Sequence, residues 1–335
     1  MPNKTFSKPF VYLLITLVSA GFIFGYAWHQ RDRLKVLEMY VFDLKSNEAI
    51  FIRTPNDRRI LINGGANSEI IRELTKILPF YSRKIDTIIA TNTNGKNVSG
   101  LIDVLKRYSV GKVILPAVTL ESIGLSTSTD HVYSVFLDTI KEKGIEVERV
   151  KKGDRVEFDS VSFNILFPTA SESFKYSKAS GPELVMKISY DKNSIFILNN
   201  VTPKIQKYIA SSTAPVTGTT APSLLAGGAL PRSSANLADS SGDSSHPSDG
   251  AKNNLVLVVF NNASPDNLAS ELTNELKPEY LIYSKSLTSS NPKSVVAKKD
   301  KIDPLFYLLV DHRFNIKEKG TIKIVSDGSL LEIGD

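Results

Sequence analysis

The chain has 335 residues, of which 41% are hydrophobic, so it holds enough apolar side chains for a packed core. It has no cysteine, which excludes disulfide frameworks, thiolate metal sites and cysteine nucleophiles. The net charge of +6 is concentrated at the start of the chain, where residues 1–35 hold five basic side chains against Asp32. The rest of the chain is therefore almost balanced, and the basic pI is weak support for nucleic-acid binding.

An uncharged segment of nineteen residues runs from Phe10 to Trp28. At 1.5 Å per residue it is just long enough to cross a hydrocarbon core of about 30 Å as a helix. A cleaved signal peptide is the alternative, because the small residues Val18, Ser19 and Ala20 precede a possible cleavage site. The apolar run continues for eight residues beyond Ala20, so we expect a short tail over residues 1–9 followed by an uncleaved transmembrane anchor over 10–28.

The remaining sequence predicts alternating strands and helices. The patterns favour strands at 37–44, 48–54, 58–65, 84–92, 111–118, 255–260 and 280–285, helices at 68–80, 98–110, 131–144 and near 265–276, further strands between 145 and 200, and a closing pair over 321–333. Between 211 and 252 the composition changes to Ser, Ala, Gly, Thr and Pro. Such a stretch cannot bury enough apolar surface to offset its ordering entropy, so we expect a disordered insertion that includes His246.

Short motifs recur along the chain in a fixed order. They are FDLKSNEA (42–49), LINGG (61–65), ATNTNGKNVSGL (90–101), ILNNV (197–201), VVFNNAS (258–264) and SSNPK (289–293). Together they resemble the metallo-β-lactamase-like domain of ComEC-type competence proteins, a family of channels for DNA uptake. The resemblance implies an α/β (α+β) fold over 36–335, namely a four-layer αββα sandwich of two mixed sheets with helices outside.

The same resemblance places the family's metal ligands on residues that are poor ligands. Its histidines and carboxylates fall on Asn92, Asn94, Lys96, Asn97, Val201 (or Asn200), Asn261 and Asn262, and its late histidines on Ser290 or Asn291. Amide oxygens bind Zn²⁺ poorly compared with imidazole or carboxylate, and valine offers no donor. We therefore expect vestigial metal-site positions, no bound metal or other cofactor, and no catalytic residue of the family type.

Two features of this region have more than one interpretation. The Lys96 ammonium could replace the metal by donating to the neighbouring amides, or it could point into solvent, as lysine usually does. The asparagine cluster could be a polar binding pocket, or a site that relaxed once chemical demand was lost. Asp43 and Glu48 match acidic positions of the family's first motif, where we expect structural hydrogen bonds.

The expected function is a membrane-anchored, non-catalytic binding or scaffold module, linked through the resemblance to DNA uptake, with its soluble domain on the extracytoplasmic side. The alternative is a hydrolase of nuclease or phosphodiesterase type with an altered metal site or none. A third reading is a domain that holds DNA without cutting it. The membrane is the expected partner, and the charge balance gives little support to a nucleic-acid partner.

Overall fold

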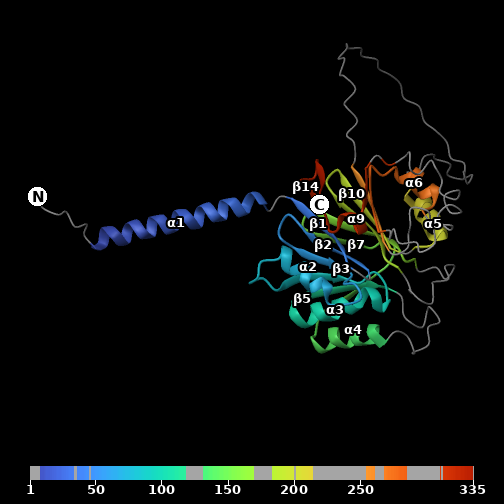
Figure 1. Cartoon of the computed structure of the whole chain (residues 1–335), viewed down its shortest axis with the longest axis horizontal. Coiled ribbons are helices and arrows are strands. Elements are labelled where there is room, and N and C mark those ends of the chain that lie inside the picture. Colours follow the sequence, from blue (N-terminus) through green and yellow to red (C-terminus); the bar gives the residue numbers. More distant parts are fainter. Residues whose placement is uncertain are drawn as a thin grey trace, which may run out of the picture.

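The computed structural model describes residues 8–33, 36–44, 47–117, 131–169, 183–199, 201–213, 254–260, 268–284, 310 and 312–334. Within these residues the strands form two sheets (Figure 1). The eight-stranded sheet has the order β15-β14-β1-β2-β3-β4-β5-β6, and the seven-stranded sheet has the order β13-β12-β11-β10-β9-β8-β7.

The strands of the eight-stranded sheet are β1 (Leu37–Asp43), β2 (Glu48–Arg53), β3 (Arg59–Ile62), β4 (Lys84–Ile89), β5 (Ser109–Pro116), β6 (Glu146–Val150), β14 (Ile322–Ser326) and β15 (Leu331–Gly334). Those of the seven-stranded sheet are β7 (Arg155–Phe158), β8 (Val161–Phe167), β9 (Val185–Tyr190), β10 (Asn193–Leu198), β11 (Leu255–Val259), β12 (Tyr280–Tyr283) and β13 (His312–Asn315). The helices are α1 (Lys8–Arg33), α2 (Glu69–Ile77), α3 (Gly95–Arg107), α4 (His131–Glu142), α5 (Pro203–Thr213), α6 (Ser270–Leu276) and α9 (Ile316–Lys319).

Strand direction gives the eight-stranded sheet two chemically different edges. Strands β3 to β6 are parallel, and β1 runs in the same direction because β1–β2 and β2–β3 are both antiparallel pairs. We call the edge where these five strands begin the amino edge, and the edge where they end the carboxyl edge. Helices α2, α3 and α4 each return the chain from the carboxyl edge to the amino edge, as a crossover between parallel strands requires.

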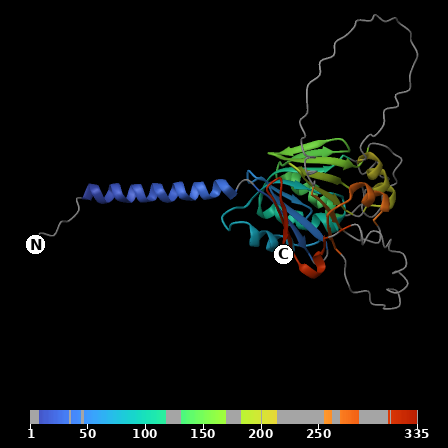
Figure 2. The same ribbon diagram turned by 90° about the horizontal axis from the view of Figure 1, so that it is seen from above.

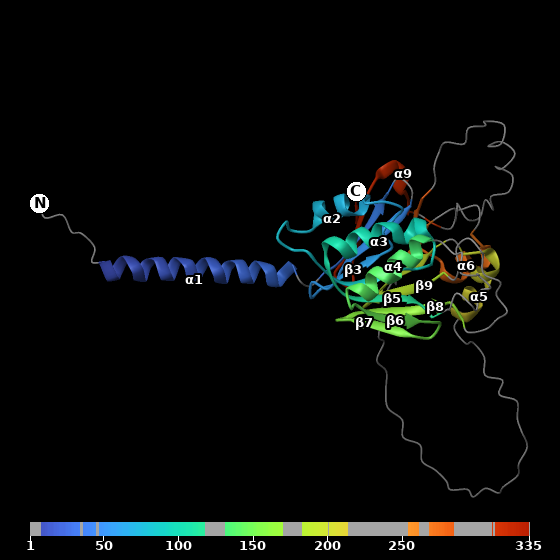
Figure 3. The ribbon, with the colours of Figure 1, turned by 90° about the horizontal axis from the view of Figure 1, so that it is seen from below.

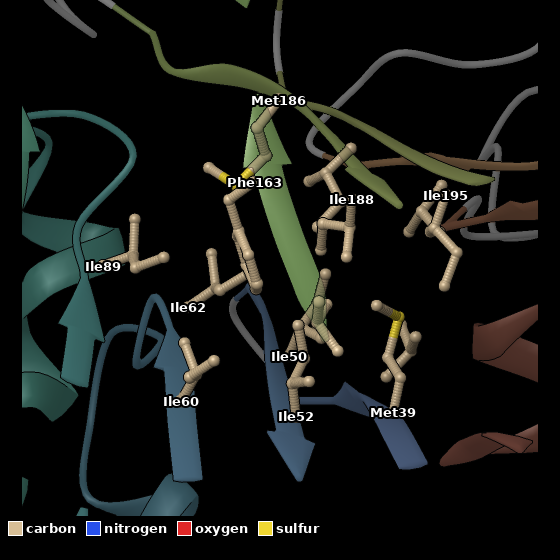
Figure 4. Close-up of a cluster of buried hydrophobic side chains, with 14 of the residues drawn as sticks. Met39, Ile50, Ile52, Ile60, Ile62, Ile89, Phe163, Met186, Ile188 and Ile195 are labelled. Atoms are coloured by element: carbon tan, nitrogen blue, oxygen red, sulfur yellow. The ribbon is translucent and has the colours of Figure 1, made fainter. Parts of the chain in front are cut away.

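The main core lies between the two sheets. Figure 4 shows side chains such as Met39, Ile50 and Ile60 from one sheet facing Phe163 and Ile188 from the other. These side chains are 0–1% exposed. Every second residue of β1 enters this core, while Tyr40 and Phe42 point to the opposite face of the sheet, because successive side chains alternate along a strand.

Each outer face of the sandwich is covered by helices. Helices α2, α3 and α4 pack against the eight-stranded sheet around a second apolar cluster that includes Leu101 and Phe136 (Figure 3). Helices α5 and α6 cover the seven-stranded sheet around a third cluster that includes Ile209 and Leu272. The predicted αββα architecture is therefore confirmed.

Helix α1 extends away from the two sheets (Figures 1 and 2). Its segment Lys8–Tyr26 has 19 residues and a mean hydropathy of 1.8, so it is long and apolar enough to cross a membrane. The helix begins two residues before the predicted anchor and continues beyond it to Arg33, because no helix-breaking residue follows Trp28.

Three sequence expectations need correction. Helix α3 begins at Gly95, three residues earlier than predicted, because Asn94 caps its first turn. Helix α5 continues to Thr213, so the first three residues of the predicted insertion are helical, and the rest of that insertion lies outside the described residues. Helix α5 and strand β13 were not predicted at all, since neither has a strong apolar pattern of its own.

Candidate functional site

The candidate site lies at the carboxyl edge, where the two sheets meet. The backbone N–H of Leu184 donates to the Thr91 carbonyl at 2.6 Å, which joins the start of β9 to the end of β4. The Thr91 N–H and hydroxyl both donate to the Asn63 side-chain oxygen at 3.0 Å, which ties the end of β3 to the same place. Ligands of sheets with parallel strands bind beyond the carboxyl ends of those strands, so this edge is where a functional site is expected.

Asn92 and Glu183 form the centre of the site. The Asn92 Nδ2 donates to both carboxyl oxygens of Glu183, at 3.0 and 2.9 Å, and the two residues are 2% and 4% exposed. Burial raises the pKa of Glu183 to about 8, and the hydrogen bonds from Asn92 oppose that shift only in part. The carboxyl group is therefore mostly protonated and neutral at pH 7.

The loop that leads into α3 is held by its own asparagines. The Asn92 Oδ1 accepts the Asn94 N–H at 3.0 Å, and the Asn94 Oδ1 accepts the Lys96 N–H at 3.0 Å as the helix cap. The Asn97 Oδ1 accepts a short hydrogen bond from the Asn47 side-chain amide. All three amide oxygens are thus engaged by N–H groups of the same chain.

Two glycines bring this loop close to the end of β3. A methyl group on Gly100 would lie 1.9 Å from the Gly64 carbonyl oxygen, and one on Gly64 would lie 2.6 Å from the Leu101 nitrogen. The close approach allows the Gly64 N–H to donate to the Asn97 carbonyl at 2.8 Å. These glycines therefore fix α3 against the end of β3.

Lys96 takes the second of its two expected positions, with its side chain in solvent. Lys96 is exposed, although the loop that carries it is ordered by the asparagine hydrogen bonds. Its side chain takes the solvent position because the buried space beside Asn92 is filled by the Glu183 carboxyl.

The other described residues of the predicted site follow strand β10 of the seven-stranded sheet. Val201 is buried in the apolar cluster beneath α5, as a hydrocarbon side chain should be. Asn199 is completely buried, and neither its Nδ2 nor its Oδ1 has a hydrogen-bond partner. Asn200, Asn261, Asn262, Ser290, Asn291 and His246 lie outside the described residues.

Asp43 and Glu48 make structural contacts, as expected. The Lys317 ammonium pairs with Asp43 and also donates to the Leu44 carbonyl at 3.2 Å, which attaches α9 to β1. Burial raises the pKa of Glu48, while a hydrogen bond with Ser284 and the charge of Lys317 oppose the rise.

The donor set does not fit a catalytic metal ion. Among the described residues, the three amide oxygens are neutral donors that already accept N–H groups, Val201 has no donor, and the Glu183 carboxyl is bonded to Asn92. His131 and His312 are exposed residues that begin α4 and β13. Within the described ranges, no group of three His, Cys, Asp or Glu side chains is arranged to hold a metal.

Sequence reasoning missed Glu183, Asn47 and Asn63. Glu183 stands two residues before the strand β9, and a carboxyl group beside the buried start of that strand was the available signal. Asn63 has a positive φ of 58°, which asparagine tolerates better than most residues, and this conformation aims its side chain at Thr91.

Two facing mixed sheets with helices on both outer faces and a polar cluster at the carboxyl edge define a metallo-β-lactamase-fold protein. Among solved structures, the chain is similar to the metallo-β-lactamase fold protein YhfI from Bacillus subtilis, with 8% identity and a TM-score of 0.44 over 89% of this chain and 99% of that chain. It is also similar to MEM-A1, a subclass B3 metallo-β-lactamase from a soil metagenome library, with 10% identity and a TM-score of 0.35 over 49% of this chain and 61% of that one.

A curated relative supports the predicted resemblance. ComE operon protein 3 of Bacillus subtilis (strain 168) is 24% identical over 160 residues, which cover 43% of this chain and 20% of the relative. The chain thus matches about a fifth of that relative's length, and no family model matches the chain. The chain is a metallo-β-lactamase-fold protein related to a protein of the ComE operon, and the predicted resemblance is confirmed.

Proposed function

We propose that this chain is a membrane-anchored, non-catalytic module of the metallo-β-lactamase fold that binds or scaffolds another molecule in connection with DNA uptake. The observation that carries the proposal is that the asparagine side chains form hydrogen bonds within the chain. Asn92, Asn94 and Asn97 stand where the family has metal ligands, and each of their oxygens accepts an N–H from the same chain.

The energetics of the site support this proposal. A metal ion bound at Asn92 would have to share the Asn92 Oδ1 with the Asn94 N–H, and a neutral amide oxygen is a poor ligand for Zn²⁺ compared with imidazole or carboxylate. Hydrolysis of the family type needs a metal ion that lowers the pKa of a bound water. The asparagine loop and Glu183 instead form a polar network that joins the two sheets at the carboxyl edge.

The anchor and the connection with DNA uptake have separate support. Helix α1 has the length and hydropathy of a membrane span, and a single span would keep the domain at the membrane surface. The match to ComE operon protein 3 supports the connection with DNA uptake that the family resemblance implies, and we propose that the domain lies on the extracytoplasmic side.

An activity assay tests the non-catalytic proposal. The full chain in detergent is incubated with single-stranded DNA and a chromogenic phosphodiester, with Zn²⁺, Mn²⁺ or Mg²⁺ added in turn. We expect no hydrolysis above that of a buffer control. Metal-dependent cleavage that is lost in Asn92→Ala would contradict the proposal.

A metal-free hydrolase is the second candidate, because Glu183 has the chemistry of a general acid. A buried carboxyl group that remains protonated near neutral pH can donate a proton to a leaving group. In that case cleavage would proceed in the presence of a chelator, would decline above about pH 8, and would be lost in Glu183→Gln.

A further inference from the structure

We propose that the amino edge of the eight-stranded sheet rests on the membrane and binds anionic phospholipid headgroups. The contact surface, which we call the basic–aromatic patch, consists of Phe80, Tyr81, Arg83, Lys106 and Arg107. The inference rests on the proposed anchoring by α1 and adds a second membrane contact, made by the folded domain.

The aromatic part of the patch is the loop between α2 and β4. Phe80 is 91% exposed and Tyr81 is 70% exposed, and their rings meet edge to face with centroids 5.3 Å apart. In the described part of the domain, no other aromatic side chain is among the exposed large hydrophobic residues. Two adjacent rings in water are unfavourable, whereas aromatic side chains are enriched at the membrane–water interface.

The basic part of the patch lies beside this loop. The Ser109 N–H donates to the Arg83 carbonyl at 2.8 Å, which places the end of α3 next to the residues that follow Tyr81. Arg83, Lys106 and Arg107 are all exposed. Burial raises the pKa of Tyr108 between them, and the charges of Arg83 and Arg107 both act to lower it, so these two cations lie close to one ring.

The charges of the patch are not neutralised by the described residues. The neighbouring Lys76 and Lys84 pair with Glu73 at 2.7 Å and with Asp86 at 2.7 Å. No described carboxylate lies within ion-pair distance of Arg83, Lys106 or Arg107. Basic residues near an anionic membrane surface each contribute about 1 kcal/mol of attraction, so three free cations form an effective headgroup site.

The covalent path from the anchor places this edge near the membrane. Three residues separate Arg33, at the end of α1, from Leu37, which opens β1 at the amino edge. The chain spans at most about 3.6 Å per residue, so the helix end and the sheet edge are no more than about 14 Å apart, and the helical residues 27–33 add about 10 Å between the apolar segment and that helix end. In Figures 1 and 3 the loop after α2 lies on the side of the domain from which α1 leaves.

This placement also fixes the direction in which the candidate site faces. The seven residues of β1 extend about 23 Å from the amino edge to the carboxyl edge. Asn92 and Glu183 lie at the carboxyl edge, so they face away from the membrane when the basic–aromatic patch rests on it.

Because the chain has no cysteine, single cysteines can be introduced and spin-labelled without removing any native thiol. The full chain is reconstituted into vesicles of equal parts phosphatidylcholine and phosphatidylglycerol, carrying Tyr81→Cys, His131→Cys or Phe22→Cys. Collision rates with oxygen, which enters lipid, and with a water-soluble nickel chelate then report the environment of each label. His131 is the matched control, since it is an exposed residue at the start of α4, on the carboxyl edge.

We expect the ratio of the collision rate with oxygen to the collision rate with the nickel chelate to be severalfold higher at residue 81 than at residue 131. Equal ratios at 81 and 131, with a high ratio at 22, would overturn the patch and leave the anchor intact. A low ratio at 22 would instead contradict the anchor. Shielding of residue 81 from both agents would mean that a protein covers the patch, which also overturns the proposal.

Charge reversal gives an independent test on the same vesicles. Arg83→Glu combined with Arg107→Glu should lower the ratio of lipid-bound to unbound domain at least about fivefold for each position, because the loss of one cation costs about 1 kcal/mol and the introduced carboxylate is repelled by the anionic surface. The control pair Lys204→Glu and Lys207→Glu on α5 makes the same change in net charge and should leave residue 81 in lipid. An equal loss of lipid binding in the two double variants would mean that only the net charge of the chain matters. That result would overturn the basic–aromatic patch as a specific headgroup site.

Discussion

The Asn92 amide donates to both oxygens of the Glu183 carboxyl, which lies 91 residues further along the chain and two residues before strand β9 of the opposite sheet. This pair links the two sheets at a position that the family resemblance assigned to a metal ligand. The hydrogen bonds fix the orientation of the Asn92 amide, because its oxygen accepts the Asn94 N–H at the same time.

The first prediction concerns the pH dependence of stability at Glu183. Its pKa is raised from 4.5 to about 8 in the folded protein, so the folded state holds more protons than the unfolded state between these values. The free energy of unfolding should therefore fall as pH rises through this window, by about 1 kcal/mol per pH unit. Glu183→Gln keeps the shape of the side chain and removes the titration. Denaturant unfolding at pH 5 to 8 should show that the free energy of unfolding of Glu183→Gln, minus that of the unmodified protein, rises with pH. A difference that does not change with pH would contradict the assignment.

The second prediction concerns Asn92. Asn92→Ala removes the donor of both hydrogen bonds to a buried carboxyl group, and it should destabilise the fold by about 1–3 kcal/mol. The loss should be larger at pH 8 than at pH 5, because the ionised carboxylate needs the hydrogen bonds more than the neutral acid does. Asn94→Ala is the control, since it removes a helix cap at a cost of about 1 kcal/mol without touching Glu183. If the stability losses of Asn92→Ala and Asn94→Ala have the same pH dependence, the hydrogen bonds from Asn92 do not stabilise the ionised form of Glu183.

A third prediction follows from the buried amide of Asn199, whose polar atoms have no hydrogen-bond partner. Replacing an unsatisfied buried amide by an apolar side chain removes a desolvation cost of about 1–3 kcal/mol. Asn199→Val should therefore raise the melting temperature of the full chain in detergent. A lower melting temperature would mean that a ligand or a water hydrogen-bonds to the Asn199 amide in solution. The carboxyl edge would then be a candidate binding pocket.

A fourth prediction concerns the contact between β3 and α3. Gly100→Ala would place a methyl group 1.9 Å from the Gly64 carbonyl oxygen, and neither backbone segment can move without disturbing the asparagine loop. We expect a loss of about 3 kcal/mol or more, since overpacking of a rigid contact is costly. Gly334→Ala meets no atom within 4 Å and should change stability by less than about 0.5 kcal/mol. Similar melting temperatures for the two variants would show that the contact is looser than described.

Much of the fold was predictable because the apolar runs are unambiguous. Strands such as β4 and β11 are short hydrophobic segments with few exposed residues and were predicted from these runs, whereas the two facing sheets were implied by the family resemblance. Strand β13 was not predictable, since two of its four residues are exposed and it exists only as the edge partner of β12.

The candidate site was predictable in position and only partly in chemistry. The motif spacing placed Asn92, Asn94 and Asn97 together, but it did not reveal that Glu183 fills the space beside them. That partner comes from the opposite sheet, and its contact with Asn92 depends on how the two sheets face each other. No local pattern contains this information, whereas the solvent position of Lys96 was one of the two positions expected from the sequence.

The most direct test of the central claim is the metal content of the full chain, purified without chelators and then equilibrated with Zn²⁺, Mn²⁺ or Mg²⁺. Since the amide oxygens at Asn92, Asn94 and Asn97 already accept N–H groups, elemental analysis should find no stoichiometric metal after gel filtration. Glu183→Gln should give the same result. One or two tightly held ions per chain would contradict the account and make the hydrolase the first hypothesis.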